Sequence, residues 1–581
     1  MSEIAQKAAA EIQAGIENAV EKAVKQGALP KAELPAFIIE TPADRAHGDL
    51  AANAAMVGAK AFHMPPFKIA KAIKEHFDLE STYAGRIEIA GPGFINFFYK
   101  PQYYAEVLRD VESKGADYGR SGYGGGKKVM VEFVSANPTG PMHMGNARGG
   151  ALGDCLASVL DAAGYNVWRE FYVNDAGNQI EKFAVSLEAR YLQIYKGEDS
   201  VPFPEDGYQG ADIKERAQEY ANAFGDRLLS LPSEERKKEL VDFALPRNIE
   251  KMQADMKKYR ITYDKWFFES ELHEGGAVDE TIEILKKNGM VYEQDGALWY
   301  KNKELQTKRL LALGKTQEEI DKLELKDDVL VRQNGNPTYF AADIAYHRNK
   351  LQERGFDFCI DIWGADHHGH VARMKGAMDA VGIDGSRLDV VLMQLVKLVR
   401  DGKPVKMSKR TGKSIQLADL LDEVPVDAAR FFFNMREANT QMDFDLDLAV
   451  KQDSQNPVYY VQYAHARICS IIKALAADGV SQRRCTDEEL MLLNAPEERE
   501  LIHHLAAYTD EIIAAARDYD PTKITRYVLQ LASLFHKFYN ACRVKGDDES
   551  LTQARLSLCT AVRTVIHNVL EMFNITAPES M

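Results

Sequence analysis

Within residues 129–172 the spacing of hydrophobic residues changes from strand-like to helix-like and back to strand-like. A nearly continuous apolar run from Val129 to Val134 predicts a strand buried on both faces of a parallel sheet. Apolar residues then recur at helical spacing from about Asn146 to Gly164, where the glycine predicts the end of a helix. A second strand-like run follows at 166–172. The stretch therefore predicts a βαβ unit.

The turn between the first strand and the helix has the character of a phosphate site. Asn137, Pro138 and Gly140 cannot easily continue a strand. His143 and Gly145 follow at the expected helix N-terminus, where free backbone N–H groups and the positive end of the helix dipole attract phosphate. Glycine allows a ligand to approach the backbone closely, and imidazole can donate a hydrogen bond. Spacing alone predicts only a nucleotide site at a strand-to-helix turn.

The hydrophobic pattern divides the rest of the chain into further units. Residues 1–120 read as a separate α/β module, with helices at 2–26 and 65–77 and strands at 37–40 and 87–90. The glycine-rich segment 121–128 does not satisfy the P-loop pattern, and we interpret it as a hinge. Residues from 172 to about 264 are charged and largely helical. Buried-strand patterns return between 328 and 400, where 390–399 reads as one last strand, and from about 456 the chain is helical.

Length and composition narrow the class of protein. A chain of 581 residues is too long for one core and predicts several domains. Its 45% hydrophobic and 27% charged residues are those of an ordinary globular protein. We expect no membrane-spanning segment and no signal peptide. The six cysteines form no C-x-x-C pair, which predicts reduced thiols and no structural zinc. A net charge of −15 argues against indiscriminate binding of nucleic acid but permits a local basic groove.

A second motif lies far downstream. Residues 399–414 read VRDGKPVKMSKRTGKS and place Lys406, Lys409 and Arg410 on a glycine-containing segment. A His-x-Gly turn followed by a KMSK segment resembles the class I aminoacyl-tRNA synthetases. The stretches VEFVSANPTGPMHMGN, YVNDAGNQ, GADHHGHVAR, DAAR and YVQYAHAR together resemble the arginyl-tRNA synthetases. The resemblance runs from HGDLAANAA near the N-terminus to the final APESM.

The resemblance implies a multidomain α/β architecture. Its centre is a class I Rossmann-like nucleotide-binding catalytic core with an inserted helical segment, flanked by an N-terminal α/β module and a C-terminal helical anticodon-binding bundle. The implied domains are an N-terminal D-loop-binding domain at 1–120, the catalytic domain at 121–410 with its insertion at about 175–264, a lysine-loop and connecting segment at 411–455, and the anticodon-binding domain at 456–581.

The resemblance also implies residues for ATP. His143, Gly145, Asn146, Lys406 and Lys409 are the expected catalytic residues. Asn146 departs from the family's second histidine; it can donate a hydrogen bond to phosphate or ribose but carries no charge. The adjacent histidines of DHHGH lack the spacing of a zinc site. The expected ATP-binding residues are Pro138, Gly140, His143, Gly145, Asn146, Gly364, Asp366, His367, Gln394, Val396, Lys406, Met407, Ser408 and Lys409.

An arginine site is implied by the same resemblance. A guanidinium is a planar fork of five donors and is bound by carboxylates placed in its plane. Glu269 and Asp343 are expected in that role, with Tyr339 packed beside them; an ordinary exposed position remains the alternative for Glu269. Asn137 and Glu132 are expected at the ammonium and carboxylate end of the amino acid. The expected arginine-binding residues are Glu132, Ser135, Asn137, Glu269, Tyr339 and Asp343.

Contacts with tRNA are expected at both ends of the chain. Exposed aromatic rings bind splayed bases, although most aromatics of segment 91–104 fit a buried core equally well. The expected tRNA-binding residues are Asn96, Tyr103, Tyr463 and Met581.

The activity implied is ATP-dependent ligation of L-arginine to its tRNA through an arginyl-adenylate. ATP would carry Mg²⁺, and we expect a cytoplasmic monomer without a dedicated metal site. Two alternatives stay open. One is another adenylating enzyme of the superfamily, such as a cysteinyl-type synthetase or a small-molecule ligase. The absent zinc cysteines argue against the cysteinyl type, and the tRNA-binding ends argue against a small-molecule ligase. The other is a non-enzymatic RNA-binding protein, against which the intact KMSK motif argues.

Overall fold

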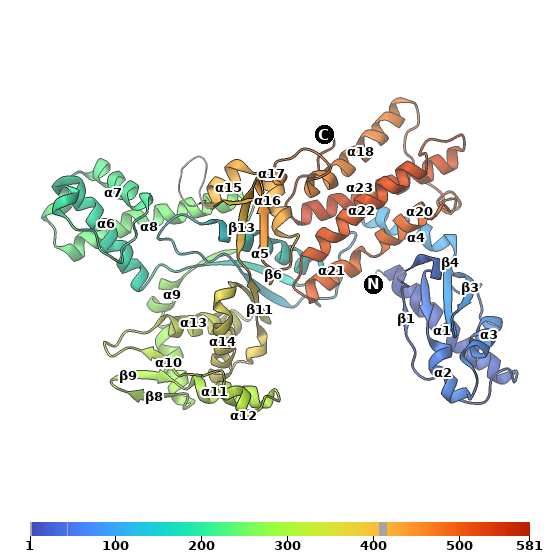
Figure 1. Ribbon diagram of the computed structural model, residues 1–581, viewed down its shortest axis with the longest axis horizontal. Coiled ribbons are helices and arrows are strands. Elements are labelled where there is room, and N and C mark those ends of the chain that lie inside the picture. The colour runs from blue at the N-terminus through green and yellow to red at the C-terminus, as the bar shows by residue number, and fades with distance from the viewer. Residues whose placement is uncertain (1–2, 43, 406–414) are drawn as a thin grey trace.

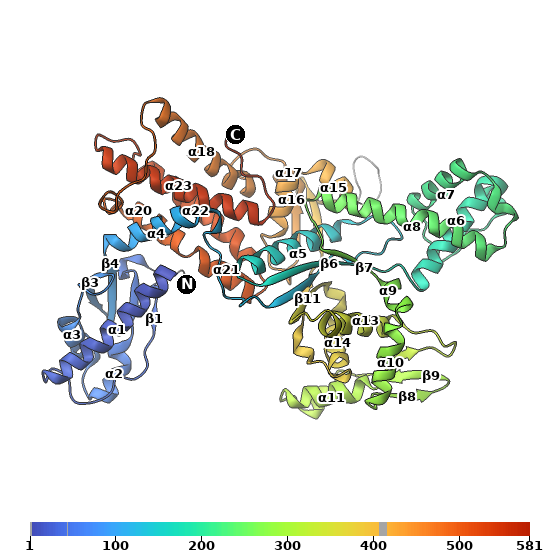
Figure 2. The ribbon, with the colours of Figure 1, turned by 180° about the vertical axis from the view of Figure 1, so that it is seen from behind.

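The protein is elongated, with a parallel sheet at its centre and separate parts extending from it (Figure 1). The computed structural model describes residues 3–42, 44–405 and 415–581. The N-terminal module lies at one end and a helical arm lies at the other, as both views show (Figures 1 and 2). The arm is made of α6 (Asn178–Lys196), α7 (Ala211–Phe224) and α8 (Ser233–Lys258). Among the described residues, no helix is long and apolar enough to cross a membrane.

The N-terminal module has a four-stranded antiparallel sheet in the order β1-β2-β4-β3. Helix α1 packs on α3 through a stripe of apolar residues that includes Ile12 and Ile16, both fully buried. The helices and strands expected here from the hydrophobic pattern are confirmed. The elements are α1 (Glu3–Lys25), β1 (Ile39–Glu40), β2 (Leu50–Ala52), α2 (Ala54–Phe62), α3 (Pro66–His76), β3 (Ala84–Ala90) and β4 (Phe94–Tyr99).

The central sheet has five parallel strands in the order β12-β11-β5-β6-β7. The predicted βαβ unit is confirmed as β5, α5 and β6. Strand β5 lies between β6 and β11, so the order of strands reverses at β5, and the carboxyl ends there form the crevice where such sheets bind ligands. The elements are β5 (Lys128–Glu132), α5 (Met144–Ala162), β6 (Asn166–Val173), β7 (Lys265–Phe268), β11 (Phe358–Gly364), α14 (His368–Ala380) and β12 (Leu388–Met393).

Two expectations for this region are wrong. Residues 390–399 form two strands, because the chain leaves the central sheet after Met393 and β13 (Val396–Arg400) pairs in another sheet with β14 (Lys403–Val405) and β15 (Met442–Asp445). The glycine-rich segment is a fixed turn instead of a hinge. The backbone N–H groups of Ser121, Gly124 and Gly126 donate to the carbonyls of residues 162–164 at 2.8–2.9 Å, which fastens the segment to the end of α5.

Two insertions extend from the central sheet. The helical arm has its own apolar core; it confirms the helical character expected between 172 and 264. The second insertion carries a three-stranded antiparallel sheet, β10-β9-β8, which the hydrophobic pattern did not indicate. The elements are α6 (Asn178–Lys196), α7 (Ala211–Phe224), α8 (Ser233–Lys258), α9 (Glu269–Glu274), α10 (Ala277–Lys287), β8 (Val291–Gln294), β9 (Ala297–Tyr300), α11 (Asn302–Ala312), α12 (Gln317–Asp321), β10 (Asp328–Val331), α13 (Tyr339–Arg348) and the π-helix η5 (Asn349–Glu353).

The C-terminal part is a bundle of helices, as expected. Helix α4 (Pro101–Lys114) packs against α20 and α23 and so joins the N-terminal module to this bundle. The elements are α15 (Leu417–Glu423), α16 (Val426–Phe433), α17 (Leu446–Ala449), α18 (Pro457–Ala477), α19 (Asp487–Leu490), α20 (Pro496–Ala506), α21 (Tyr508–Arg517), α22 (Thr522–Ala541) and α23 (Glu549–Met572).

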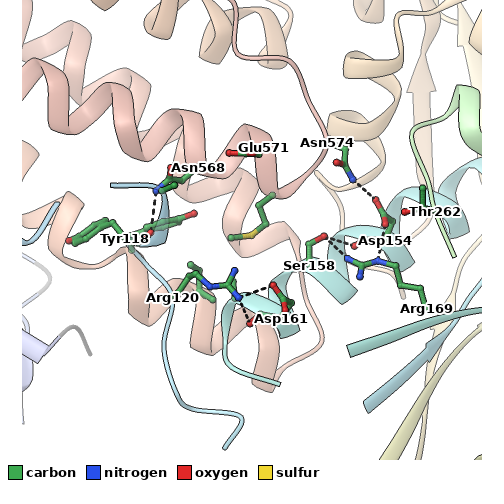
Figure 3. A pocket seen from close by; sticks show the side chains of 15 residues that line it. Tyr118, Arg120, Asp154, Ser158, Asp161, Arg169, Thr262, Asn568, Glu571 and Asn574 are labelled. Atoms are coloured by element: carbon green, nitrogen blue, oxygen red, sulfur yellow. Dashed lines mark hydrogen bonds and ion pairs between the residues drawn. The ribbon is translucent and has the colours of Figure 1, made fainter. Parts of the chain in front are cut away.

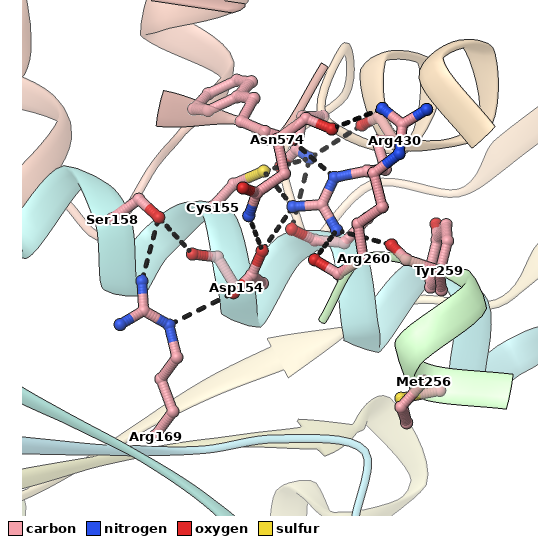
Figure 4. Close-up of polar contacts among 12 residues, drawn as sticks. Asp154, Cys155, Ser158, Arg169, Met256, Tyr259, Arg260, Arg430 and Asn574 are labelled. Carbon is pink, nitrogen blue, oxygen red and sulfur yellow. Dashed lines mark hydrogen bonds and ion pairs between the residues drawn. The ribbon is translucent and has the colours of Figure 1, made fainter. Parts of the chain in front are cut away.

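A buried arginine joins the bundle to the central sheet. Arg430 of α16, the arginine of the DAAR motif, is fully buried and pairs with Asp154 of α5 (Figure 4). Its Nε donates to the carbonyl of Phe573 at 2.5 Å, and its Nη1 donates to the carbonyl of Tyr259 at 3.0 Å. Asp154 also accepts from Arg169 at 3.1 Å. One guanidinium thus holds α5, the end of the helical arm and the C-terminal segment together.

A cavity of about 590 Å³ lies next to this junction (Figure 3). Arg120, Asp161 and Glu571 are among the side chains around it, together with Asp154 and Arg169 from the junction itself. Arg120 pairs with Asp161 at 2.9 Å, and both side chains are about half exposed. The buried and exposed arginine pairs therefore stand close together in the same part of the fold.

Replacing Arg430 tests the junction. Arg430→Met is expected to cost about 3–5 kcal/mol of the free energy of unfolding, because the buried Asp154 loses one of its two arginine partners and two backbone carbonyls lose their donor. Arg120→Met, the matched control, removes an exposed pair and is expected to cost no more than about 1 kcal/mol. The thermal midpoints of the two variants give the comparison. Equal shifts would show that the junction contributes no more than a surface ion pair.

Candidate functional site

The candidate site is a pair of adjoining cavities at the carboxyl ends of β5 and β11. The first, of about 370 Å³, lies among β5, β6, β11 and α13. The second, of about 450 Å³, lies between the 137–146 turn and the loop at 208–212 of the helical arm. Val134, Ser135 and Asn137 line both cavities. Ligands bound in the two cavities would therefore meet at the segment that follows β5.

The backbone after β5 is held in a strained conformation. Val134 and Ser135 have φ angles of 72° and 44°, and positive φ is costly for a β-branched residue such as valine. The Ser135 hydroxyl donates to Glu132 at 2.8 Å and accepts from the backbone N–H of Tyr172 at 3.2 Å. These two hydrogen bonds fix the turn at the point where the two cavities join.

The predicted phosphate turn opens helix α5. His143 is the N-cap: its Nδ1 accepts from the backbone N–H of Gly145 at 3.1 Å, and the Asn146 side chain accepts from the N–H of His143 at 3.0 Å. A Cβ at position 145 would come within 2.9 Å of the His143 ring, so this arrangement requires glycine. Asn146 therefore completes a reciprocal cap, and both side chains line the second cavity.

The helical arm holds this turn from the outside. Asn248 of α8, only 6% exposed, donates to the carbonyl of Pro138 at 2.9 Å, and Arg216 of α7 donates to Asn248 at 2.8 Å. Asp212, at the start of α7, lines the second cavity opposite Gly140. Burial raises the pKa of the Asp212 carboxyl group. Two helices of the arm thus fix the position of the phosphate turn.

Two carboxylates near the first cavity have no cationic lysine or arginine partner among the described residues. Glu269, at the start of α9, is 3% exposed and accepts from the Tyr172 hydroxyl at 2.9 Å; burial raises its pKa. Asp343 of α13 lies 3.4 Å from Nε2 of His370. Because Nδ1 of His370 accepts from Arg373 at 3.0 Å, the proton is on Nε2 and the ring is neutral. The two carboxylates are therefore suited to bind a cationic group of a ligand.

The residues expected to bind the amino acid lie close together. Glu132, Ser135, Asn137 and Asp343 line the first cavity. Glu269 and Tyr339 line a neighbouring cavity of about 830 Å³ between α6, α9 and the segment before α13. Tyr172 lines the first cavity and is hydrogen-bonded to Glu269, which connects the two. The Tyr339 hydroxyl accepts from the backbone N–H of Gln179 at 3.2 Å.

The residues expected on the adenine side are more dispersed. Gly364 and His367 line the first cavity, while Asp366 stands beside them with its side chain 83% exposed. Gln394 and Val396 lie at the break between β12 and β13 and line neither of the two cavities. The backbone carbonyl of Gln394 accepts from the buried Arg148 at 2.8 Å. Their contacts with ATP stay predictions.

Lys406, Met407, Ser408 and Lys409 lie outside the described residues. The chain on their C-terminal side is attached to the phosphate turn: Gln416 forms a β-bridge with His143, and the N–H of Leu417 donates to the carbonyl of Met142 at 2.9 Å. The described residue before the lysine segment is Val405, the last residue of β14. The segment's C-terminal flank therefore starts beside the second cavity.

The expected tRNA contacts of the N-terminal module need correction. Tyr103 is 2% exposed and stacks on Tyr99 with ring centroids 4.0 Å apart, so it is a core residue and offers no face to a base. Asn96 is 3% exposed in the central strand β4, which leaves almost none of its side chain for RNA. Tyr463 and Met581 are 42% and 51% exposed, and their contacts stay predictions.

Several residues of the first cavity were missed from the sequence. Tyr172, Tyr346 and His347 line it, and Lys350 and Asp361 form a buried layer behind it. One signal was available: positions 339, 343 and 347 are four residues apart and so share one face of a helix. Polar residues at that spacing in the segment PTYFAADIAYHRNK could have indicated that α13 turns this face toward a ligand.

Comparison with known proteins gives consistent matches along the chain. Residues 10–99 match "Arginyl tRNA synthetase N terminal domain", residues 111–469 match "tRNA synthetases class I (R), catalytic domain", and residues 461–581 match "DALR anticodon binding domain". The chain is 54% identical over 581 residues to the arginine–tRNA ligase of Caldanaerobacter subterraneus subsp. tengcongensis, with 100% of each chain covered. It is 53% identical over 571 residues to that of Ruminiclostridium cellulolyticum, with 98% of each covered. Thermus thermophilus arginyl-tRNA synthetase has the same fold, with a TM-score of 0.70 at 22% identity over 97% of this chain and 99% of that chain.

Replacing Asn248 tests how the arm holds the phosphate turn. Asn248→Ala leaves the buried Pro138 carbonyl without its donor, at a cost of about 1–3 kcal/mol. The backbone amides of residues 139–146 are expected to exchange hydrogen faster, as measured by mass spectrometry. Asn222→Ala, which removes an exposed amide from α7, is the control and should leave these amides unchanged. Unchanged exchange in both variants would contradict a holding role for the arm.

Proposed function

The chain belongs to the arginyl-tRNA synthetase family, and from this premise we propose how its two cavities share the reaction. Relatives named arginine–tRNA ligase match over the full length, which supports ATP-dependent charging of tRNA with arginine as the activity. We assign the first cavity to arginine and the second to the phosphates of ATP. Asn137 and Ser135, which line both, would then stand where the amino acid and the nucleotide meet.

The observation that carries this assignment is the pair of carboxylates that have no lysine or arginine partner among the described residues; the imidazole of His273 lies 3.5 Å from Glu269. Glu269 and Asp343 reach the site from different elements, and only a neutral histidine faces Asp343. A guanidinium would satisfy both carboxylates with paired, charge-assisted hydrogen bonds. Tyr339 would pack beside the substrate side chain, and Glu132 would meet the ammonium group.

Activation of arginine is then mainly a matter of position and charge. The arginine carboxylate attacks the α-phosphorus of ATP, forming arginyl-adenylate, and pyrophosphate leaves. His143, Gly145 and the N-terminus of α5 stabilise the negative charge on the phosphates from one side. We assign Lys406 and Lys409 to the opposite side, together with Met407 and Ser408. Pro138, Gly140 and Asn146 shape the turn, and Gly364, Asp366, His367, Gln394 and Val396 are assigned to the nucleoside.

Transfer to tRNA completes the reaction. A hydroxyl of the terminal ribose attacks the carbonyl carbon of arginyl-adenylate, and AMP leaves. Because no protein nucleophile is involved, the enzyme contributes orientation and electrostatic stabilisation. Helix α18 and the C-terminal segment present Tyr463 and Met581 at the surface, where we propose that they meet the anticodon loop.

We propose domain roles that follow the expected divisions: tRNA elbow binding by 1–120, catalysis by 121–410, connection by 411–455 and anticodon binding by 456–581. We propose that the protein acts as a monomer. We propose that Mg²⁺ would enter with the phosphates of ATP. We place the reaction in the cytoplasm, in keeping with the six free thiols.

Amino-acid-dependent ATP–pyrophosphate exchange tests the proposal. We expect exchange with L-arginine and with no other standard amino acid, measured with and without the cognate tRNA. Charging of that tRNA with labelled arginine is the second measurement. Exchange with another amino acid would refute the assignment of Glu269 and Asp343, and tight tRNA binding without any exchange would indicate a non-enzymatic protein.

Asp343→Asn tests the guanidinium site. The variant removes one charge from the site, so the KM for arginine is expected to rise about tenfold or more, because a charge-assisted hydrogen bond is lost. Inhibition by citrulline, which carries a neutral ureido group in place of the guanidinium, should weaken much less. Glu318→Gln, an exposed carboxylate on α12, is the control. An equal loss of affinity for arginine and citrulline would place the guanidinium elsewhere.

A further inference from the structure

A lysine is completely buried behind the first cavity. Lys350 has no exposed surface and belongs to the π-helix η5, which continues α13. In this short segment the N–H of Arg354 donates to the carbonyl of Asn349 at 2.9 Å, five residues back. Such π-turns are rare and are often found at functional sites. The same helical segment carries Tyr339 and Asp343, which line the substrate cavities.

The Lys350 ammonium group lies between two carboxylates. It donates to Glu132, at the end of β5, and to Asp361 of β11 at 3.0 Å. It also lies 4.2 Å from the centre of the Tyr346 ring. Glu132 faces the first cavity, whereas Asp361 is fully buried and does not line it. Lys350 thus connects a cavity-facing carboxylate to one that is inaccessible.

His347 supplies the second positive charge of this cluster. Its Nδ1 donates to the backbone carbonyl of Asp343 at 2.7 Å, so Nδ1 carries a proton. Its Nε2 lies 2.7 Å from the Asp361 carboxylate. When that carboxylate is ionised, it can only accept a hydrogen bond from the imidazole. Burial works to raise the pKa of Asp361, but the charges of Lys350 and His347 outweigh it and hold that pKa below its usual range. Asp361 therefore faces both Lys350 and His347, whereas Glu132 is paired with Lys350.

We propose that Lys350 is a positioning residue that keeps the Glu132 carboxylate ionised and turned toward the ammonium group of the substrate. The proposal rests on the proposed function, because it takes arginine as the occupant of the first cavity. Ser135 holds one oxygen of Glu132 at 2.8 Å and Lys350 holds the other. With both oxygens fixed, the carboxylate enters the cavity in one orientation, at no cost of reorganisation when substrate binds.

Loss of the lysine would change the charge of Glu132 specifically. Asp361 would keep His347 as its partner, whereas Glu132 would keep only the neutral Ser135 hydroxyl. Burial raises the pKa of Glu132, and the Lys350 charge opposes that rise. Without Lys350, the pKa of Glu132 would rise further and the carboxylate would bind a proton more readily. The other titratable groups around the cluster are Asp343 and Tyr346 on α13, Cys359 on β11, Glu170 and Tyr172 on β6, and Arg354 after η5.

Lys350→Met removes the charge while keeping a side chain of similar length. At pH 7 the KM for arginine is expected to rise about tenfold or more, since an ionised partner of the substrate is lost, while kcat changes less. The sign of the pH dependence follows from the raised pKa of Glu132 in the variant. Binding weakens below that pKa and returns as the pH rises through it. The KM ratio of variant to parent should therefore fall toward 1 as the pH is raised.

Two further variants separate charge from structure. Lys350→Met combined with Asp361→Asn removes the carboxylate that repels Glu132, so part of the arginine affinity at pH 7 is expected to return. Arg354→Met is the matched control, because Arg354 forms the neighbouring buried pair with Glu170 and does not line the first cavity. It should lower the thermal midpoint without a pH-dependent change in KM. A KM ratio for Lys350→Met that is independent of pH would overturn the proposal.

A readout without substrate distinguishes this proposal from the proposed function. Infrared difference spectra of Lys350→Met at pH 7 should show the C=O stretch of a protonated carboxylic acid that is absent from the parent protein. The band should disappear in the Lys350→Met, Glu132→Gln double variant. Its absence from Lys350→Met refutes the role of Lys350, whereas its presence in a protein that does not activate arginine refutes only the substrate assignment.

Discussion

The buried pair of Arg430 and Asp154 is the contact on which the arrangement of the domains depends. Removing two charges from water is costly, and here the cost is offset by three backbone carbonyls and a second arginine, Arg169, around the pair. The carbonyls belong to the end of the helical arm and to the C-terminal segment, so the charges are satisfied only when all these parts are in place. Because Asp154 and His143 are on the same helix, α5, the contact that joins the bundle to the sheet also positions the phosphate turn.

The charged side chains behind the first cavity and those at its front differ in how they are paired. Behind the first cavity, Lys350 is paired with both Glu132 and Asp361, and His347 also contacts Asp361. At the front, Glu269 and Asp343 have no lysine or arginine partner among the described residues; Glu269 accepts from Tyr172 and lies 3.5 Å from His273, and Asp343 faces His370. A site of this kind gains more from a guanidinium than from a neutral side chain, since burial raises the pKa of Glu269 and a cation beside it would oppose that rise.

Local rules predicted the βαβ unit and the phosphate turn well. A continuous apolar run, a His-x-Gly N-terminus and a glycine stop all lie between Val129 and Gly164, and the structure has them at the expected positions. The predictions were wrong where contacts between residues far apart in the sequence determine the structure. The run 390–399 has the apolar pattern of one strand, but Arg148 binds the carbonyl of Gln394 and β13 finds its partners in another sheet. Tyr103 has an aromatic ring of the kind that stacks on bases, yet its neighbours in the folded module bury it.

The sequence by itself determined the class of fold, the order of the domains and the two signature motifs, because these depend on periodicity and on short spacings that any chain with this pattern shares. Only the tertiary structure decided which charges meet. Lys350 and Glu132 are 218 positions apart, and Arg430 and Asp154 are 276 positions apart. No local pattern relates residues at such separations. Their charges come together only because α13 and α16 pack near the sheet that contains β5 and β11. Each buried charge there requires a partner.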